Sequence, residues 1–93
     1  MTIEFQWDPG KASISARKHG IAFEEAVTAF DDALSLTIPD PLHSQGESRL
    51  VLMGRSTAGR LLVVVHVERG DSIRVISART ATRKERKTYE EDT

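Results

Sequence analysis

Basic residues and a tyrosine gather between positions 79 and 89 of the chain. Arg79 ends a stretch of alternating apolar and polar residues, and the motif Thr82–Glu85 (TRKE) follows it. In such a motif the threonine oxygen and the glutamate each cap a free backbone N–H, so a helix should begin there. The cations of this expected helix, which reaches Tyr89, are Arg83, Lys84, Arg86 and Lys87. A basic strand end beside a basic helix predicts a surface for an anionic partner.

Metal-free cleavage of RNA is a reaction that such a surface can support. The 2′-hydroxyl must lose a proton, the pentavalent phosphorane gains negative charge, and the leaving 5′-oxygen needs a proton. Arginine stabilises that charge with its planar fork of donors. Glu68, His66 or Tyr89 is suited to moving the protons.

The strand pattern predicts which of these side chains share a face of the sheet. Residues 60–69 alternate so that Arg60, Leu62, Val64, His66 and Glu68 point one way. Arg49 and Arg55 share a face of the preceding strand, and either Arg74 or Arg79 of the following strand falls on that side. We therefore expect one face to combine several arginines with His66 and Glu68.

Structural roles compete with these functional ones. Glu68 beside Arg69 suits a surface ion pair, and Glu85 is better explained by helix capping than by catalysis. His66 suits a partly buried strand position, and Tyr89 suits packing of the last helix. For Arg79 a functional role is the better explanation, because a threonine or serine would serve a strand-to-helix junction as well.

Composition narrows the class of protein. With 93 residues, 39% of them hydrophobic and 29% charged, the chain predicts one globular domain spanning 1–93. The absence of cysteine excludes disulfides and thiolate metal sites. Scattered glycines and widely spaced histidines predict neither a nucleotide loop nor a zinc site, so we expect no metal and no cofactor.

No apolar run approaches the roughly 20 residues of a membrane helix, and the N-terminus does not resemble a signal peptide. A cytoplasmic protein is therefore expected.

Charge is distributed unevenly although the net charge is only −1. Residues 1–47 hold three cations and eight acids, whereas residues 48–93 hold ten cations and six acids. The second half therefore carries the predicted anion-binding surface, and the alternative is an ordinary solvated surface.

The elements expected to position these residues define an α+β fold. Strands are predicted over 2–7, 33–38, 49–55, 60–69 and from 72 to 79, and helices over 9–18, 22–31 and from 82 onward. Asp8 should cap the first helix and Gly20 should end it. The order is β-α-α-β-β-β-β-α: a single antiparallel sheet, with 60–69 central, two N-terminal helices and one C-terminal helix.

The chain resembles the BrnT family of type II toxins over nearly its whole length. The matching segments are 5–12 with 18–21, 23–26 with 30–32, and 74–79 with 85–86 and 89, joined by Asp40, His43, 47–49, 54–56 and 59–62. Ser15 stands where the family usually has asparagine. The resemblance implies a RelE-like fold and a ribonuclease that inhibits translation by metal-independent cleavage.

The same resemblance implies partners and site residues. The partners are a BrnA-type antitoxin with a ribbon-helix-helix domain, RNA that is free or on the ribosome, and operator DNA bound through the antitoxin only. Carried over residue by residue, the resemblance points to Arg55 or Arg60, to Arg79 and Tyr89, and also to Glu68 and Lys18. The predicted catalytic set is therefore Arg55, Arg60, Glu68, Arg79 and Tyr89. The predicted RNA-binding set joins Lys18 to cations of the basic surface, which are Arg49, Arg83, Lys84, Arg86 and Lys87.

Two other classes of function stay open. The chain is alternatively a non-catalytic nucleic-acid-binding module, such as a degenerate toxin kept as a co-repressor. It is otherwise an interaction domain whose basic face binds only an acidic antitoxin segment. Substitution of Arg79 and Tyr89 separates the three classes, because only the ribonuclease would lose toxicity.

Overall fold

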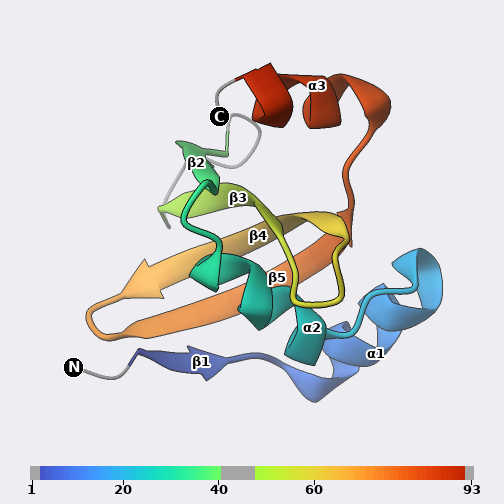
Figure 1. Cartoon of the computed structure of the whole chain (residues 1–93). Helices are drawn as coiled ribbons and strands as arrows, with labels where there is room; N and C mark the ends of the chain where they lie inside the picture. Colours follow the sequence, from blue (N-terminus) through green and yellow to red (C-terminus); the bar gives the residue numbers. More distant parts are fainter. Residues whose placement is uncertain (1–2, 41–47, 92–93) are drawn as a thin grey trace.

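The computed structural model describes residues 3–40 and 48–91, which form a five-stranded sheet and three α-helices (Figure 1). The elements are β1 (Glu4–Gln6), α1 (Pro9–His19), α2 (Phe23–Thr28), the 3-10 turn η1 (Ala29–Asp31), β2 (Leu36–Pro39), β3 (Arg49–Arg55), β4 (Leu61–Arg69), β5 (Ser72–Thr80) and α3 (Arg83–Glu91). Within the described residues, no helix is long and apolar enough to cross a membrane.

The sheet has the strand order β1-β5-β4-β3-β2, so the predicted central position of β4 is confirmed. The α+β class and the order of the elements are also confirmed. Antiparallel pairs join β2 to β3, β3 to β4 and β4 to β5. The exception is β1, which lies parallel to β5 with Glu4 opposite Ser72. This pairing joins opposite ends of the chain, and no local pattern marks it.

Local capping bonds set the helix ends as predicted. The Asp8 carboxylate accepts a hydrogen bond from the Gly10 N–H at 2.7 Å, and α1 ends at Gly20 with a φ of 72°. At the start of α3 the Thr82 N–H donates to Glu85 at 2.8 Å, and the Glu85 N–H donates to the Thr82 hydroxyl at 3.1 Å. Both bonds of the predicted capping box are therefore present.

Element boundaries differ most from the prediction around Asp32. The helix predicted over 22–31 is α2 followed by η1, and the strand predicted over 33–38 is β2 at Leu36–Pro39. The Asp32 carboxylate accepts a hydrogen bond from the Leu34 N–H at 2.9 Å, which makes a turn where the strand was expected to begin. The expected loop over 39–47 lies mostly outside the described residues.

One face of the sheet, here called the core face, is covered by α1 and α2. Phe23, Ile21 and Ala26 pack on Leu62 and Val64 of β4, and all five side chains are fully buried. Full burial of each large apolar side chain contributes about 2 kcal/mol to stability. Most of the large apolar side chains that are fully buried therefore lie on this face.

The opposite face is here called the α3 face, because residues of α3, which Figure 1 shows above β2 and β3, adjoin β3 and β4 there. Val51 and Met53 of β3 and Val63 of β4 line an apolar pocket of about 210 Å³ on this face. The pocket is closed on one side by Glu85 and Thr88 of α3 and on another by Leu36 and Ile38 of β2.

A bulge in β5 controls which of its residues reach the α3 face. Ser77 lies opposite Val65, but Val75 lies opposite His66, so Ile76 is the extra residue. Arg74 and Arg79 would point to opposite faces of a regular strand. The bulge puts both on the α3 face, opposite Val67 and Val63.

Candidate functional site

Four arginines surround the apolar centre of the α3 face. Arg49 and Arg55 of β3 lie opposite Val67 and Leu61, and Arg74 and Arg79 lie opposite Val67 and Val63. The expectation that Arg49, Arg55 and an arginine of β5 share a face with His66 and Glu68 is therefore wrong. In this register β3 aligns its arginines with the odd-numbered residues of β4, whereas His66 and Glu68 belong to the even-numbered set on the core face.

Arg79 forms a paired contact with the capping residue of α3. Its two terminal nitrogens donate to the two Glu85 carboxylate oxygens, each at 2.8 Å. The Arg79 hydrogen bonds hold the pKa of Glu85 down, to about 2, so Glu85 stays ionised and is a poor proton carrier. Arg79 thus has a structural role that the sequence did not show, although 39% of its side chain stays exposed.

Tyr89 is the buried residue of α3, and its hydroxyl donates to Asp32 at 2.6 Å. The same Asp32 oxygen accepts the backbone N–H of Arg55 at 2.8 Å, and the Arg55 guanidinium carbon lies 5.6 Å from the centre of the Tyr89 ring. A pocket of about 390 Å³ adjoins them. Its lining is Thr28, Asp31, Asp32, Leu34, Arg55, Ser56, Thr57 and Tyr89.

The hydrogen bond between Tyr89 and Asp32 fixes the protonation state of both side chains. The hydrogen bond to Asp32 is the main reason that the Tyr89 pKa is raised, so the phenol keeps its proton at neutral pH. Burial opposes ionisation of Asp32, but hydrogen bonds from Tyr89 and from the backbone of Arg55 and Leu34 outweigh it and lower the Asp32 pKa. Tyr89 is accordingly able to donate a proton and is unsuited to accept one.

Asp32 was not among the predicted site residues. The sequence places it beside Asp31 at the end of a helix, where an acidic solvent face is the ordinary interpretation. Its bond to Tyr89 spans 57 positions, so the only signal was its place in one of the segments that resemble the toxin family.

Arg60 and Glu68 lie away from the other predicted catalytic residues. Arg60 pairs with Glu25 of α2, with its Nε donating at 3.0 Å, and the Ser56 hydroxyl donates to the same carboxylate at 2.7 Å. The Arg60 hydrogen bond is the main reason that the Glu25 pKa is lowered. Glu68 lies seven residues from Leu61, about 23 Å along β4 from the partner of Arg55.

His66 is buried on the core face, as the alternative interpretation of this residue predicted. Its ring packs against Phe30 with the ring centres 4.8 Å apart, and its Nδ1 lies 3.3 Å from the Val64 carbonyl oxygen. Burial lowers the His66 pKa. The imidazole is therefore neutral at pH 7 and shielded from any substrate on the α3 face.

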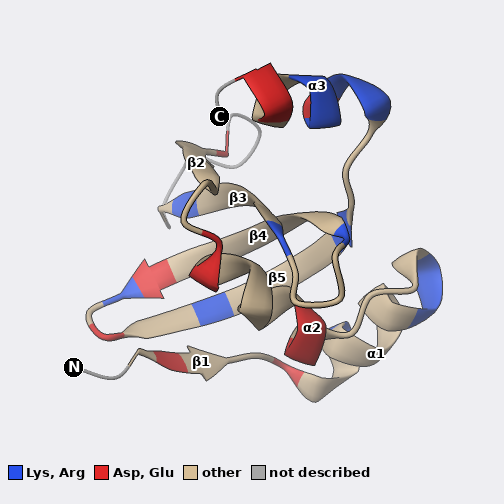
Figure 2. Cartoon of the chain, in the orientation of Figure 1, with Lys and Arg blue, Asp and Glu red and all other residues tan. Residues whose placement is uncertain are grey.

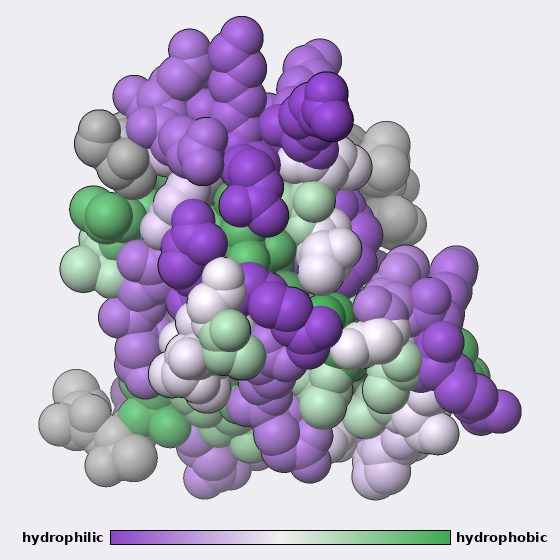
Figure 3. All heavy atoms as spheres, turned by 45° about the vertical axis from the view of Figure 1, so that its right-hand side comes forward, coloured by the Kyte–Doolittle hydropathy of each residue, from purple (hydrophilic) through white to green (hydrophobic). Residues whose placement is uncertain are grey.

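The predicted RNA-binding cations lie in three places, on α3, at one end of β3 and at the end of α1. Arg83, Lys84, Arg86 and Lys87 are exposed on α3, and Figure 2 shows them as the blue half of that helix. Figure 3 shows a hydrophilic surface over α3 and apolar surface directly beneath it. Arg49 lies at one end of β3, and Lys18 lies at the end of α1.

Comparison with known proteins places the chain in a class of small ribonuclease toxins with this α+β fold. Residues 7–85 match the model of a family described as the ribonuclease toxin, BrnT, of type II toxin–antitoxin systems. The chain belongs to the BrnT family.

Structural comparison agrees with this assignment. The crystal structure at 1.1 Å of the Brucella abortus ribonuclease toxin BrnT gives a TM-score of 0.69 at 22% sequence identity. The alignment covers 88% of this chain and 100% of that one, and at this identity it concerns the fold alone. A comparison with curated protein sequences gives no match.

Proposed function

We propose that this toxin inhibits translation by cleaving RNA without a metal ion, on the side of the sheet that carries α3. The observation that supports this is the gathering of Arg55, Arg79 and Tyr89 on that side. Glu85 and Tyr89 are four residues apart on α3, so the contact of Arg79 and the contact of Arg55 are neighbours along the helix.

Each residue has a defined part in this mechanism. The two arginines stabilise the charge that develops on the phosphorane. Solvent water takes the proton of the 2′-hydroxyl as that oxygen bonds to phosphorus, and the Tyr89 hydroxyl, released from Asp32, gives its proton to the 5′-oxygen as the bond from phosphorus to that oxygen breaks. Asp32 is a positioning residue that holds the Tyr89 side chain beside Arg55 before RNA binds. Arg60 and Glu68 are left out of the proposed site because Arg60 is paired with Glu25 and Glu68 lies at the other end of β4.

Metal independence is supported by the donor set. The described residues contain no group of three or more His, Asp or Glu side chains placed to hold a metal ion. The proposed partner is a BrnA-type antitoxin, which would bind operator DNA for the pair, and the proposed site of action is the cytoplasm.

The test is cleavage of a short RNA by the purified protein in the presence of EDTA. We expect products that end in a 2′,3′-cyclic phosphate, and no cleavage where a 2′-deoxynucleotide precedes the scissile bond. Activity that EDTA abolishes and magnesium restores would contradict the proposal. Mapping of RNA ends after induction in a bacterium, with and without the antitoxin, tests the inhibition of translation.

A non-catalytic nucleic-acid-binding module is the second candidate. One observation favours it: Arg79 and the Tyr89 hydroxyl are both engaged in internal bonds, to Glu85 and Asp32. This candidate predicts that the protein binds RNA or DNA through the same arginines and that no RNA is cleaved under any condition.

A further inference from the structure

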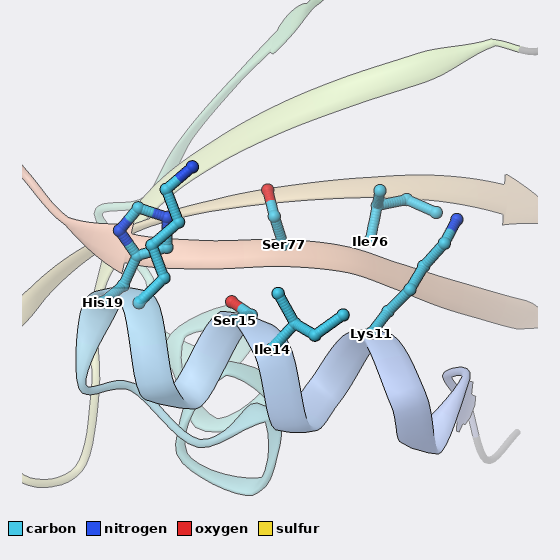
Figure 4. A pocket seen from close by; sticks show the side chains of 7 residues that line it. Lys11, Ile14, Ser15, His19, Ile76 and Ser77 are labelled. Atoms are coloured by element: carbon cyan, nitrogen blue, oxygen red, sulfur yellow. The ribbon is translucent and has the colours of Figure 1, made fainter.

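A groove lies between α1 and the outer edge of β5, away from Arg55 and Tyr89 (Figure 4). On this edge β1 pairs only with Ser72–Arg74, so residues further along β5 face α1 instead. The groove has a volume of about 220 Å³, and its lining is Lys11, Ile14, Ser15, Lys18, His19, Ile76 and Ser77.

Ser15 fixes the two walls of the groove to each other. Its hydroxyl donates to the Ala78 carbonyl oxygen at 3.3 Å and accepts from the Ala78 N–H at 3.4 Å. These bonds replace the missing strand partner of Ala78, and serine makes them at the position where asparagine is usual in the family. The groove is therefore preformed and needs no rearrangement before it binds a ligand.

The charged side chains along the groove are basic. Lys11 and Lys18 line it together with His19, and none of the lining residues is acidic. Within the described part of the chain neither lysine forms an ion pair, whereas Arg60 and Arg79 are both neutralised by glutamates. Lys11 and Lys18 therefore bring positive charge without an internal ion-pair partner to this groove.

The floor of the groove is apolar and offers one hydroxyl. Ile14 of α1, whose exposed fraction is 60%, lies across the groove from Ile76 and Ser77 of β5 in Figure 4. Such a floor suits the carbon atoms of a sugar, and the hydroxyl suits a phosphate or sugar oxygen. No phenylalanine, tyrosine or tryptophan lines the groove, so the small His19 ring is the one side chain of its lining on which a base can stack.

The spacing of the two lysines fits a nucleic-acid strand. They are seven residues apart, which places them on one side of α1 and about 10 Å apart. A stacked strand carries one phosphate per about 3.4 Å of its axis. The lysines can therefore contact separate phosphates of the same strand.

The strand β5 links the groove to the proposed active site. Ser77 and Arg79 both belong to the α3 face and are two residues apart, about 7 Å along β5. A strand whose scissile phosphate lies at Arg79 can extend along β5 into the groove.

We propose that the α1–β5 groove is a subsite for the backbone of the RNA strand that flanks the cleavage point. Lys11 and Lys18 contact its phosphates, and Ser77 contacts a phosphate or a sugar hydroxyl. The subsite rests on the proposed function, since RNA is its occupant. The subsite does not discriminate between base sequences, because contacts to phosphates carry no information about the bases.

The test measures binding without cleavage, using the full chain and a fluorescent 2′-O-methyl RNA oligonucleotide. Its blocked 2′-oxygen prevents strand scission. Lys11→Ala with Lys18→Ala should lower the slope of log K against log salt by roughly 1.4, because each single-strand phosphate contact contributes about 0.7. The affinity should fall to a similar degree for oligonucleotides of different sequence.

Matched controls come from the same helix. Arg17→Ala removes the same charge beside Lys18 from a position that does not line the groove, and it should change the slope by less than either lysine substitution. Ile14→Glu should weaken binding severalfold more than Ser13→Glu, since only residue 14 lines the groove. Circular dichroism confirms that each variant is folded.

The outcomes separate the subsite from the proposed activity. A wild type that binds the oligonucleotide through Lys11 and Lys18 but cleaves no RNA supports the subsite and contradicts the activity. The subsite is overturned if Arg17→Ala has the same effect as the lysine substitutions. It is also overturned if the double variant binds RNA normally and loses only its affinity for the antitoxin, since the groove would then be a protein-binding site.

Discussion

Arg79 combines an electrostatic and a structural task in one side chain. Its bond pair to Glu85 ties the end of β5 to the first turn of α3, and its exposed edge faces the proposed phosphate site. A substitution of Arg79 alone therefore removes both contributions, and the partner residue offers a way to separate them.

Arg79→Ala should abolish most of the RNA cleavage, whereas Glu85→Gln should keep it. Loss of one donor to the phosphorane costs roughly 2–4 kcal/mol in the barrier. Glutamine keeps the capping bond of the helix and leaves the arginine charged. Initial cleavage rates of the two purified variants test this, with thermal unfolding as the control. Equal losses in both variants would show that anchoring of α3 matters and the charge does not.

His66 makes the stability of the fold depend on pH. Burial depresses its pKa in the folded state, against weaker opposite effects from the Val64 carbonyl and Glu68. The unfolded chain therefore binds a proton more readily than the folded one. This contribution to stability is complete above the unfolded pKa of about 6.5 and is lost as pH falls from there towards the folded pKa.

Urea unfolding between pH 8 and pH 5 should show this loss directly. We expect the free energy of unfolding of the wild type to fall below about pH 6.5, and His66→Leu to flatten the decline. Leucine fills the buried position without a titrating group, and the other two histidines are common to both proteins. The same pH slope in both would mean that His66 is not the group responsible.

The helix α3 is held to the sheet chiefly by polar side chains at two of its turns. Tyr89 is its buried residue, and the contacts of Glu85 and Tyr89 reach Arg79, Asp32 and Arg55. A helix secured in this way should open locally before the rest of the molecule unfolds.

Tyr89→Phe should loosen α3 without affecting the centre of the sheet. It removes a hydrogen bond to a charged carboxylate, which is worth about 1.5–3 kcal/mol. Amide hydrogen exchange should accelerate over Arg83–Glu91 and stay unchanged over β4. Asp32→Asn keeps one acceptor oxygen for the Tyr89 hydroxyl but puts an NH2 group where the Leu34 N–H donates, so it should accelerate exchange at the turn of Leu34 more than in α3. Unchanged exchange in α3 would indicate that packing of the ring alone holds the helix.

The elements that the sequence predicted well are those specified by neighbouring residues. Asp8, Gly20 and the Thr82–Glu85 box act within one turn of their helices, and each behaves as predicted. The position of β4 followed from its own apolar run. These signals are local, so a single sequence is enough to recognise them.

The register of the strands could not be predicted from the sequence, and this register decides which residues share a face in the candidate site. Whether Arg55 faces Glu68 or Val63 depends on a pairing between strands, and a shift of one residue reverses the outcome. The bulge at Ile76 likewise decided that both Arg74 and Arg79 face α3. The residue types of the candidate site were predictable, but their grouping and the contact of Asp32 with Tyr89 were not.

Across the whole molecule, the charge asymmetry of the sequence becomes an asymmetry of surfaces. Residues 48–87 carry ten cations and three acids, and the cations of α3 and of the α3 face belong to this segment. Acidic residues cluster around α2 and η1 (Figure 2). An antitoxin that covers the basic surface with an acidic segment would also exclude RNA phosphates from it.

Association with the antitoxin should therefore become slower as salt is added. Charge reversal at Arg83 and Lys87, one turn apart and exposed on α3, should slow association severalfold at low salt by weakening electrostatic steering. The matched control reverses the exposed Glu24 and Asp31, because Glu25 is held by Arg60 and Ser56 and its loss would disturb the fold. Stopped-flow association rates at several salt concentrations measure both variants. A larger effect at Glu24 and Asp31, or antitoxin protection from hydrogen exchange confined to α2 and η1, would place the antitoxin on the acidic side instead.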